Sequence, residues 1–376
     1  MRLRVAWSVL VHEKARGLLA ICGIFFATLL IFMQLGFYSA VPKAGTMVYD
    51  AMRFDIALTS ASYVFQLSSQ TFPRRRLYQA QQIEGVESVA PVYMDISNWL
   101  NPEGRVLRGI FVIGFELGKT VFNLPDIERQ VDTLALTDTV LADTATRSIL
   151  GPLTPGRQVE IGERTVRIGG SYVLGTGFLG QGVLVASSVN FARLFPDRVQ
   201  GVVNLGLVQL KPGSDPDRIA DQLRALLPAD VRVFTRAELY AHENRHWMVR
   251  TSTGLIFGFG VIVAFIVGVV ILYQTLATQI ARYISQYAAL KGIGYSDFYL
   301  SQIVLLLAIS MCAVAFGPAF VAADLVYGVV RNATKLPVEM TMTRTLSVLV
   351  LVMVMATLSS LISLGRLRRA DPADLL

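Results

Sequence analysis

The chain contains 376 residues, of which 53% are hydrophobic and only 16% are charged, and its formal net charge at pH 7 is +7. Soluble domains carry about 25% charged residues, so this composition disfavours a purely soluble enzyme. The hydrophobic residues are concentrated in a few blocks, which predicts a globular domain tethered by membrane-spanning helices. Lysines and arginines flank these blocks, so the positive charge indicates membrane topology and gives little support to nucleic-acid binding.

Four long stretches of the chain contain no Asp, Glu, Lys or Arg. Each is long enough to cross about 30 Å of hydrocarbon, which takes roughly 20 helical residues. We therefore expect membrane spans at residues 17–42, 251–281, 298–323 and 345–365. Residues 1–16 are predicted to form an amphipathic helix before the first span, and residues 366–376 a tail after the last one.

The orientation of the spans follows from the basic residues in the short segments between them, because cytoplasmic segments retain Lys and Arg. Basic residues lie before the first span, between the second and third, and after the fourth: Arg2, Arg4, Lys14, Arg16, Arg282, Lys291, Arg366, Arg368 and Arg369. A smaller group, Arg331, Lys335 and Arg344, opposes this assignment. We predict an inner (plasma) membrane protein with both termini in the cytoplasm. The segments 43–250 and 324–344 then lie on the periplasmic side.

The segment of residues 43–250 has ordinary polarity and frequent turn signals, which predicts a large α/β domain. Glycines punctuate short strand patterns at about 155–190, so a small β-rich subdomain is expected there. Thr235-Arg236-Ala237-Glu238 has the pattern of a capping box, which starts a helix. That helix is predicted to run over residues 236–250 straight into the second span as a rigid stalk. The predicted fold class is an α+β membrane protein with four transmembrane helices and a large extracytoplasmic α/β domain.

This outer domain offers no convincing pattern for a bound cofactor. It contains no cysteine, which excludes disulfides and thiolate metal sites within it. Residues 175–180 match G-x-G-x-x-G, a pattern that binds dinucleotides when its third glycine opens a helix. Residues 181–185 instead continue as a strand pattern, so we predict a turn and no cofactor.

His242-Glu243-Asn244-Arg245-His246 matches the zinc-protease pattern H-E-x-x-H. On a helix the two histidines could ligate zinc while Glu243 activates water. A third ligand is required, however, and the only other histidine, His12, is predicted to lie on the opposite side of the membrane. We therefore keep a membrane zinc metalloprotease as a remote alternative, and a polar stalk as the preferred interpretation.

The second span contains small residues at spacings suited to close helix contact, namely Gly254, Gly258, Ala264 and Gly268. In lipid, such residues let helices approach and pack. Their partners could be other spans of the same chain or a second copy in a homodimer, and the sequence leaves both open.

Arg74, Arg75 and Arg76 form the one dense basic cluster of the predicted outer domain. Such a cluster is typical of a solvated helix end or of one that faces lipid headgroups. A contact with an acidic partner is the alternative.

The short segment 282–297, between the second and third spans, predicts an amphipathic helix that ends at Gly294. Glycine permits the chain reversal into the third span. A short, partly apolar helix on the inner surface is suited to dock a cytoplasmic partner, or simply to rest on lipid.

The residues Tyr287-Ala288-x-Leu290-Lys291-x-x-Gly294 resemble the coupling helix of the FtsX/MacB family of ABC transporter permeases. The tail from Arg368 to Leu376 looks like the ending of that family. The similarity is greatest to exporter subunits of the DevC type, through Ala6-Trp7, the run from His12 to Arg16, the run from Phe32 to Phe37, and the run from Arg74 to Ala80. Gln286 departs from the family, which usually has Glu before the Tyr.

The resemblance implies a non-catalytic membrane subunit whose coupling residues Gln286, Tyr287, Leu290, Lys291 and Gly294 contact a separate ATP-binding subunit. It further implies a homodimer that works with a periplasmic membrane-fusion protein and an outer-membrane channel of the TolC type. The cargo would be a glycolipid or another amphiphile, and ATP would be bound by the partner alone. A signalling permease that controls a periplasmic enzyme is the alternative within the family.

Overall fold

A computed structural model describes residues 14–101, 106–175, 177, 180–285, 293–334 and 336–368. The chain forms two compact units. The first consists of the described parts of Met1–Ser39, Thr253–Arg331 and Val338–Leu376, and we call it the membrane unit. The second consists of Ala40–Ser252 and the described part of Asn332–Pro337, and we call it the inserted domain.

Four helices of the described chain are long and apolar enough to cross a membrane, which confirms the four predicted spans. They are α2 (Lys14–Asp50), α9 (Ser252–Arg282), α11 (Asp297–Thr334) and α12 (Met342–Arg368). Two of them continue past their predicted ends at residues 42 and 323, so the segment predicted as a loop at 324–344 is helical as far as Thr334. A charged residue ends an apolar stretch but does not end a helix, because Lys43 and Asp324 both keep the backbone amide that proline lacks.

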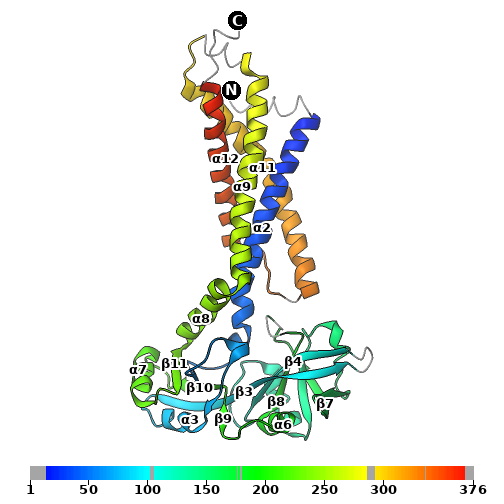
Figure 1. Ribbon diagram of the computed structural model, residues 1–376, viewed down its shortest axis with the longest axis vertical. Helices are drawn as coiled ribbons and strands as arrows, with labels where there is room; N and C mark the ends of the chain where they lie inside the picture. Colours follow the sequence, from blue (N-terminus) through cyan, green and yellow to red (C-terminus); the bar gives the residue numbers. More distant parts are fainter. Residues whose placement is uncertain are drawn as a thin grey trace. The chain divides into compact units, whose positions relative to one another are not determined.

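The helices of the membrane unit pack on a shared apolar core (Figure 1). Ile31 and Phe32 of α2, Leu272 of α9, Val304 of α11 and Met355 of α12 are all buried in it. Three polar contacts between helices are seen among the described residues: the hydroxyl of Tyr327 donates to the carbonyl of Phe32, the Ser359 hydroxyl donates to the carbonyl of Val269 at 2.9 Å, and the Arg344 guanidinium donates to the Ser39 hydroxyl. Dispersion contacts and isolated hydroxyl bonds are what holds helices together in lipid.

The inserted domain is built on a nine-stranded mixed sheet, in the order β11-β1-β10-β3-β4-β8-β5-β7-β6. Its strands are β1 (Ile56–Ser60), β3 (Val86–Asn101), β4 (Val106–Phe115), β5 (Thr139–Asp143), β6 (Gln158–Ile161), β7 (Arg164–Tyr172), β8 (Val183–Ser187), β10 (Leu205–Leu210) and β11 (Val231–Thr235). β2 (Phe72–Pro73) pairs separately with β9 (Val202–Val203). The short helices are α3 (Arg75–Ala80), α4 (Pro125–Glu128), α5 (Val131–Ala135), α6 (Ser188–Leu194), α7 (Pro216–Leu226) and α8 (Arg236–Arg245). Single 3₁₀ turns lie at Gln66–Ser68 and Ser148–Leu150.

The first half of the sheet, β11-β1-β10-β3, is antiparallel and contains two β-α-β units, as in split β-α-β folds. The helices of these units, α3 and α7, cover one face and bury residues such as Leu77 and Leu223 (Figure 1). Leu239 of α8 and Val48 and Tyr49 of α2 are buried in a second core, together with Leu205 and other strand residues. Side chains alternate between the two cores because successive strand residues point to opposite faces.

The second half of the sheet closes on itself, because β6 pairs with the far end of the long strand β3 at Trp99 and Leu100. The six strands β3-β4-β8-β5-β7-β6 thus form a ring with its own core, which includes Trp99, Ile110 and Leu184. The pairs β4–β8 and β5–β7 are parallel. The glycine-rich segment predicted as a small subdomain at 155–190 is therefore part of a larger closed sheet. Its strands find their partners in β3, β4 and β5, which are distant in sequence.

Candidate functional site

The helix α8 begins at the predicted capping box. The Glu238 amide donates to the Thr235 hydroxyl at 3.4 Å, and the Thr235 amide donates to the Glu238 carboxylate at 2.8 Å. Arg224 of α7 forms an ion pair with the same carboxylate. These contacts satisfy amides that a helix start otherwise leaves unpaired, and they fasten α8 to its neighbouring helix.

The predicted stalk is not one continuous helix with the second span. After α8 the chain forms a π-helical turn at His246–Arg250, and Thr251 is extended, with φ of −98° and ψ of 152°. The Thr251 hydroxyl donates to the carbonyl of Trp247 at 2.6 Å. A β-branched residue favours extended backbone. The Thr251 hydroxyl also bonds a carbonyl that would otherwise accept a backbone amide of the helix. The stalk therefore has a break at Thr251, which corrects the prediction of a rigid rod.

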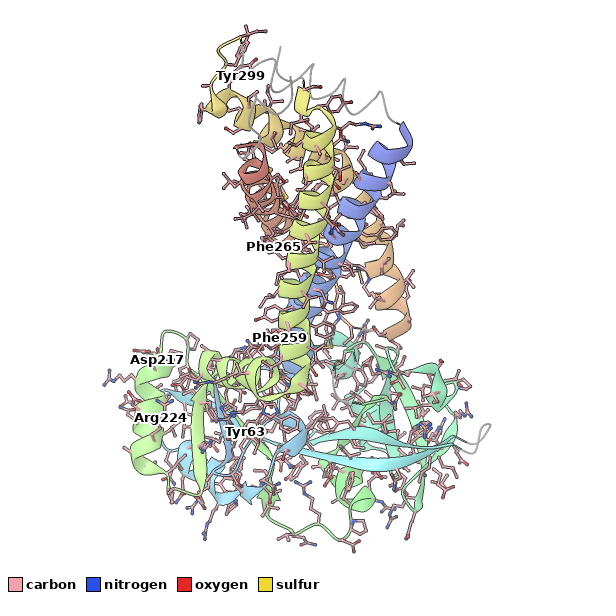
Figure 2. All side chains as sticks on the ribbon, turned by 45° about the horizontal axis from the view of Figure 1, so that its top comes forward. Tyr63, Asp217, Arg224, Phe259, Phe265 and Tyr299 are labelled. Carbon is pink, nitrogen blue, oxygen red and sulfur yellow. The ribbon has the colours of Figure 1, made fainter. Side chains whose placement is uncertain are left out.

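Three buried side chains inside the inserted domain connect the end of α2 to α8. Tyr63, which follows β1, donates its hydroxyl hydrogen to the Glu243 carboxyl group of α8. The hydroxyls of Tyr49, on α2, and Tyr63 lie 2.6 Å apart. All three residues have at most 2% of their surface exposed. We call Tyr49, Tyr63 and Glu243 the junction cluster; Figure 2 labels Tyr63.

Burial controls the electrostatics of the junction cluster. It raises the pKa of Glu243 from 4.5 to about 7, because the charged carboxylate loses its hydration, while the hydrogen bond from Tyr63 offsets only part of this effect. Burial also raises the pKa of Tyr63 well above its usual value. Glu243 therefore keeps its proton to a higher pH than an exposed glutamate does.

A second set of contacts surrounds the cluster and joins the same two segments. The guanidinium of Arg236 on α8 donates to the carbonyl of Tyr49 at 3.2 Å and lies 4.8 Å from the centre of the Phe54 ring. The Tyr240 hydroxyl donates to the Asp50 carboxylate at 2.6 Å. A cation is favourable at the last carbonyls of a helix, here the end of α2. The two chain segments that lead to the first and second spans are therefore bound to each other.

Gly45 of α2 brings Trp247 into this junction. A Cβ atom at Gly45 would lie 2.4 Å from Cδ1 of Trp247, which real Cβ atoms do not tolerate. The indole ring therefore needs a glycine beneath it. Phe65 is part of the same packing, with its ring 5.6 Å from that of Trp247.

The side chains of the H-E-x-x-H pattern take part in this packing. His242 bonds through Nε2 to the carbonyl of Val64 at 2.9 Å, and His246 stacks on Phe65 with ring centres 4.2 Å apart. Glu243 is directed to Tyr63 instead. Among the described residues, no group of three His, Cys, Asp or Glu side chains is placed to hold a metal ion. The zinc-protease alternative thus has no supporting geometry in the described chain.

Of the predicted coupling residues, Gln286, Tyr287, Leu290 and Lys291 lie outside the described residues. Gly294 is described: it is exposed and has a φ of +101°, a conformation that favours glycine. The chain enters α11 three residues later, at Asp297.

The predicted small residues of the second span pack within the membrane unit. Gly254 and Ala264 are buried. A Cβ at Gly268 would lie 2.3 Å from Sδ of Met355 on α12, and one at Gly258 would lie 3.4 Å from the ring of Tyr38. These contacts correspond to the first of the two interpretations, packing against spans of the same chain.

The arginines 74–76 do not form one patch. Arg76 is buried and holds Asp230 through two nitrogens, with its Nη2 at 2.8 Å, so it is unavailable to an external partner. Arg74 pairs with Glu116, and Arg75 is exposed. Sequence reasoning missed the partners of these arginines because both carboxylates lie far away along the chain.

Sequence reasoning also missed the junction cluster, apart from Glu243 itself. Its remaining members are tyrosines without any motif. The one usable signal was a glutamate in a helix beside aromatic residues, which the metal pattern concealed.

The arrangement defines a multi-pass membrane protein with an α/β domain inserted between its first two spans. A family model described as MacB-like periplasmic core domain matches residues 18–226, and one described as FtsX-like permease C-terminal matches residues 258–372. The chain belongs to the FtsX/MacB family of ABC transporter permeases. No match is found among curated proteins.

Two solved structures are similar to part of this chain. The periplasmic region of MacB from Actinobacillus actinomycetemcomitans is 11% identical, with a TM-score of 0.34, over 48% of this chain and 87% of that one. The extracellular domain of the noncanonic ABC-type transporter YknZ from Gram-positive bacteria is 14% identical, with a TM-score of 0.35, over 48% of this chain and 99% of that one.

Proposed function

We propose that this permease is the membrane subunit of an ATP-driven export complex. A separate ATP-binding chain hydrolyses ATP and moves the segment 282–297, and the second span carries this motion to the inserted domain. Both termini lie in the cytoplasm, and the inserted domain lies on the periplasmic side of the inner membrane. The exported molecule is a glycolipid or another amphiphile, as in relatives of the DevC type.

The observation that carries this proposal is the junction. The chain enters the inserted domain through α2 and leaves it through α8, and these two segments are held together by the junction cluster and by Arg236. A displacement of either span must therefore act on the other through a buried, well-packed contact. Packed cores transmit displacement because they have low compressibility.

The break at Thr251 refines the mechanism. A continuous rod would push the inserted domain along its axis, whereas an extended residue between α8 and α9 acts as a joint. Hinges are commonly a few residues at the ends of elements. Motion of the second span thus reaches the inserted domain chiefly through the paired segments around Gly45 and Trp247.

The composition of the membrane unit also supports a subunit that transmits motion and does not itself form a polar pore. Its buried polar residues, among those described, are Thr28, Arg344, Ser359, Ser360 and Ser363. Arg344 is satisfied by the Glu339 carbonyl and the Ser39 hydroxyl. Ion and proton pathways require chains of ionisable groups, and a single arginine bonded to neighbouring oxygens does not provide one.

The partners complete the proposed machine: two copies of this chain, two ATP-binding subunits, a periplasmic membrane-fusion protein and an outer-membrane channel of the TolC type. Purification from native membranes followed by mass spectrometry tests this set. Recovery of a membrane-fusion protein supports export. Recovery of a cell-wall hydrolase in its place would replace export by signalling.

ATP hydrolysis by the reconstituted complex tests the coupling. Leu290→Asp and Gly294→Pro are expected to abolish the stimulation of ATP hydrolysis by this subunit, because proline cannot adopt the φ of +101° found at Gly294. Ile293→Val serves as the control and retains stimulation. Unchanged stimulation in both test variants, with normal membrane insertion, would refute the coupling role of this segment.

A further inference from the structure

A cavity of about 640 Å³ opens on the inserted domain, on the side of the closed strand ring where α6 packs. It is lined by α6, by the segment that follows α6, and by Arg74, Tyr93 and Arg164 from other elements. We call it the basic cavity. Its volume lies in the range of pockets that hold small organic ligands, about 300–1,000 Å³.

The floor of the basic cavity is aromatic. The ring of Phe191 lies 5.7 Å from that of Tyr93 and 4.6 Å from that of Phe195. Gly114 makes room for it, because a Cβ there would lie 2.6 Å from Phe191. The guanidinium of Arg198 lies 5.3 Å from the centre of the same ring. Phe191 itself is only 1% exposed, so the half-buried rings of Tyr93 and Phe195 supply the accessible apolar area of this floor, and Arg198 adds a cation beneath it.

The rim of the basic cavity carries four arginines and, among its described lining residues, no carboxylate. Arg74, Arg193 and Arg198 each pair with an acid outside the lining. The exposed Arg164 makes no ion pair or side-chain hydrogen bond with the described residues, although its charge, with that of Arg193, acts on the Asp138 carboxylate. The Nη1 and Nη2 atoms of Arg198 are bonded to Met94, Asp95 and Asn204, and its Nε is buried, so Arg198 contributes charge but no free donor. The Arg164 guanidinium thus retains donors for an anionic ligand.

Apolar side chains flank this charge. Val189 and Val199 line the cavity, and 68% and 72% of their surfaces are exposed. A free inorganic anion would gain nothing from these valines or from the aromatic floor. A molecule with a charged head and an apolar body would contact both, because burying apolar surface is favourable.

We infer that the basic cavity binds an anionic amphiphile, with its phosphate, sulfate or carboxylate group held by Arg164 within the positive charge of the rim, and its apolar part laid on Phe195, Tyr93 and the flanking valines. The identification of this ligand as cargo rests on the proposed export function. The binding site itself does not require ATP hydrolysis or any partner chain.

Photolabelling of the purified full chain tests the site. The probe is a long-chain fatty acid that carries a diazirine, and the matched neutral probe is its methyl ester. The fatty acid is expected to label the peptide that covers residues 188–202, as mapped by mass spectrometry, about tenfold more strongly than the ester, since one charge-assisted hydrogen bond is worth about that factor.

Two variants localise the effect. Arg164→Glu is expected to reduce labelling of this peptide about tenfold, and Ala192→Trp to block it by filling the cavity beside exposed Ala192 without changing charge. Arg167→Glu, an exposed position of the same strand that does not line the cavity, is the control and keeps full labelling.

Several outcomes would overturn the inference: equal labelling by the ester, labelling confined to the membrane spans, unchanged labelling in both cavity variants, or complete displacement of the probe by inorganic phosphate alone, which would define a site for free anions. If the cavity is labelled as expected but this subunit fails to stimulate ATP hydrolysis in the assembled complex, the export proposal is contradicted and the site is left intact.

Discussion

Replacement of Glu243 by glutamine removes the titratable group of the junction cluster and preserves its shape. Glutamine resembles the protonated carboxyl group and keeps an oxygen to accept the hydrogen bond from Tyr63. The variant therefore isolates one quantity, the free energy of holding a carboxylate in this buried place.

The magnitude follows from the pKa of Glu243, which folding raises from 4.5 to about 7. One pKa unit corresponds to about 1.4 kcal/mol. Between these two values the folded chain binds a proton that the unfolded chain has released, so the free energy of unfolding falls as the pH rises. The stabilisation present below pH 4.5 is thus lost progressively up to about pH 7, by about 3 kcal/mol in all, and changes little above that.

Heat unfolding of the purified full chain, followed by tryptophan fluorescence between pH 5 and pH 8, measures this effect. For a domain of this size, about 3 kcal/mol shifts Tm by roughly 6–12 °C. Glu243→Gln is expected to match the unchanged chain near pH 5 and to unfold at the higher temperature at pH 8. Glu160→Gln, at an exposed position of β6, is the control and follows the unchanged chain at every pH.

The reasoning would be refuted by a Glu243→Gln variant whose Tm follows that of the unchanged chain throughout this range. It would equally be refuted by a variant that is less stable at pH 8, since that would mean that the carboxylate form makes a stabilising contact. Loss of a metal-dependent proteolytic activity in the same variant would restore the zinc-protease interpretation.

Three further outcomes are expected. In Gly45→Val, the valine side chain would collide with Trp247 and separate α2 from the end of α8. The assembled complex is expected to hydrolyse ATP without exporting its cargo. Export at the normal rate would contradict this expectation. Asp143→Ala should lower the free energy of unfolding by about 2–3 kcal/mol, as measured by denaturant titration. The Asp143 carboxylate accepts hydrogen bonds from the backbone amides of Ala145, Leu174 and Gly175, which the variant would leave unpaired. A loss below about 0.5 kcal/mol would show that water replaces the carboxylate as acceptor. In a cysteine-free background, a thiol introduced in place of exposed Asp217 should react with an impermeant reagent in intact spheroplasts, whereas one in place of exposed Ser296 should react only after permeabilisation, and the reverse pattern would invert the topology.

Patterns that are local in sequence predicted local structure well. The charge-free stretches identified the four spans, because crossing hydrocarbon requires length and apolarity and little else. The capping box at Thr235 and the strand after residues 175–180 are both present, because each depends on residues only a few positions apart. The ends of α2 and α11 were less predictable, since a helix continues wherever its hydrogen bonds do.

Contacts between distant residues decided the rest. The closure of the strand ring by β3 and β6, the pairing of Arg76 with Asp230, and the burial of Glu243 against Tyr63 each join segments that no short motif connects. The sequence by itself determined that this is a four-span membrane protein with an inserted α/β domain, because the hydropathy and turn patterns that indicate these features are local in the sequence. Only the tertiary structure decided that Glu243 is buried in a junction with Tyr63 and Tyr49, because the environment of a carboxyl group depends on neighbours that folding brings from elsewhere in the chain.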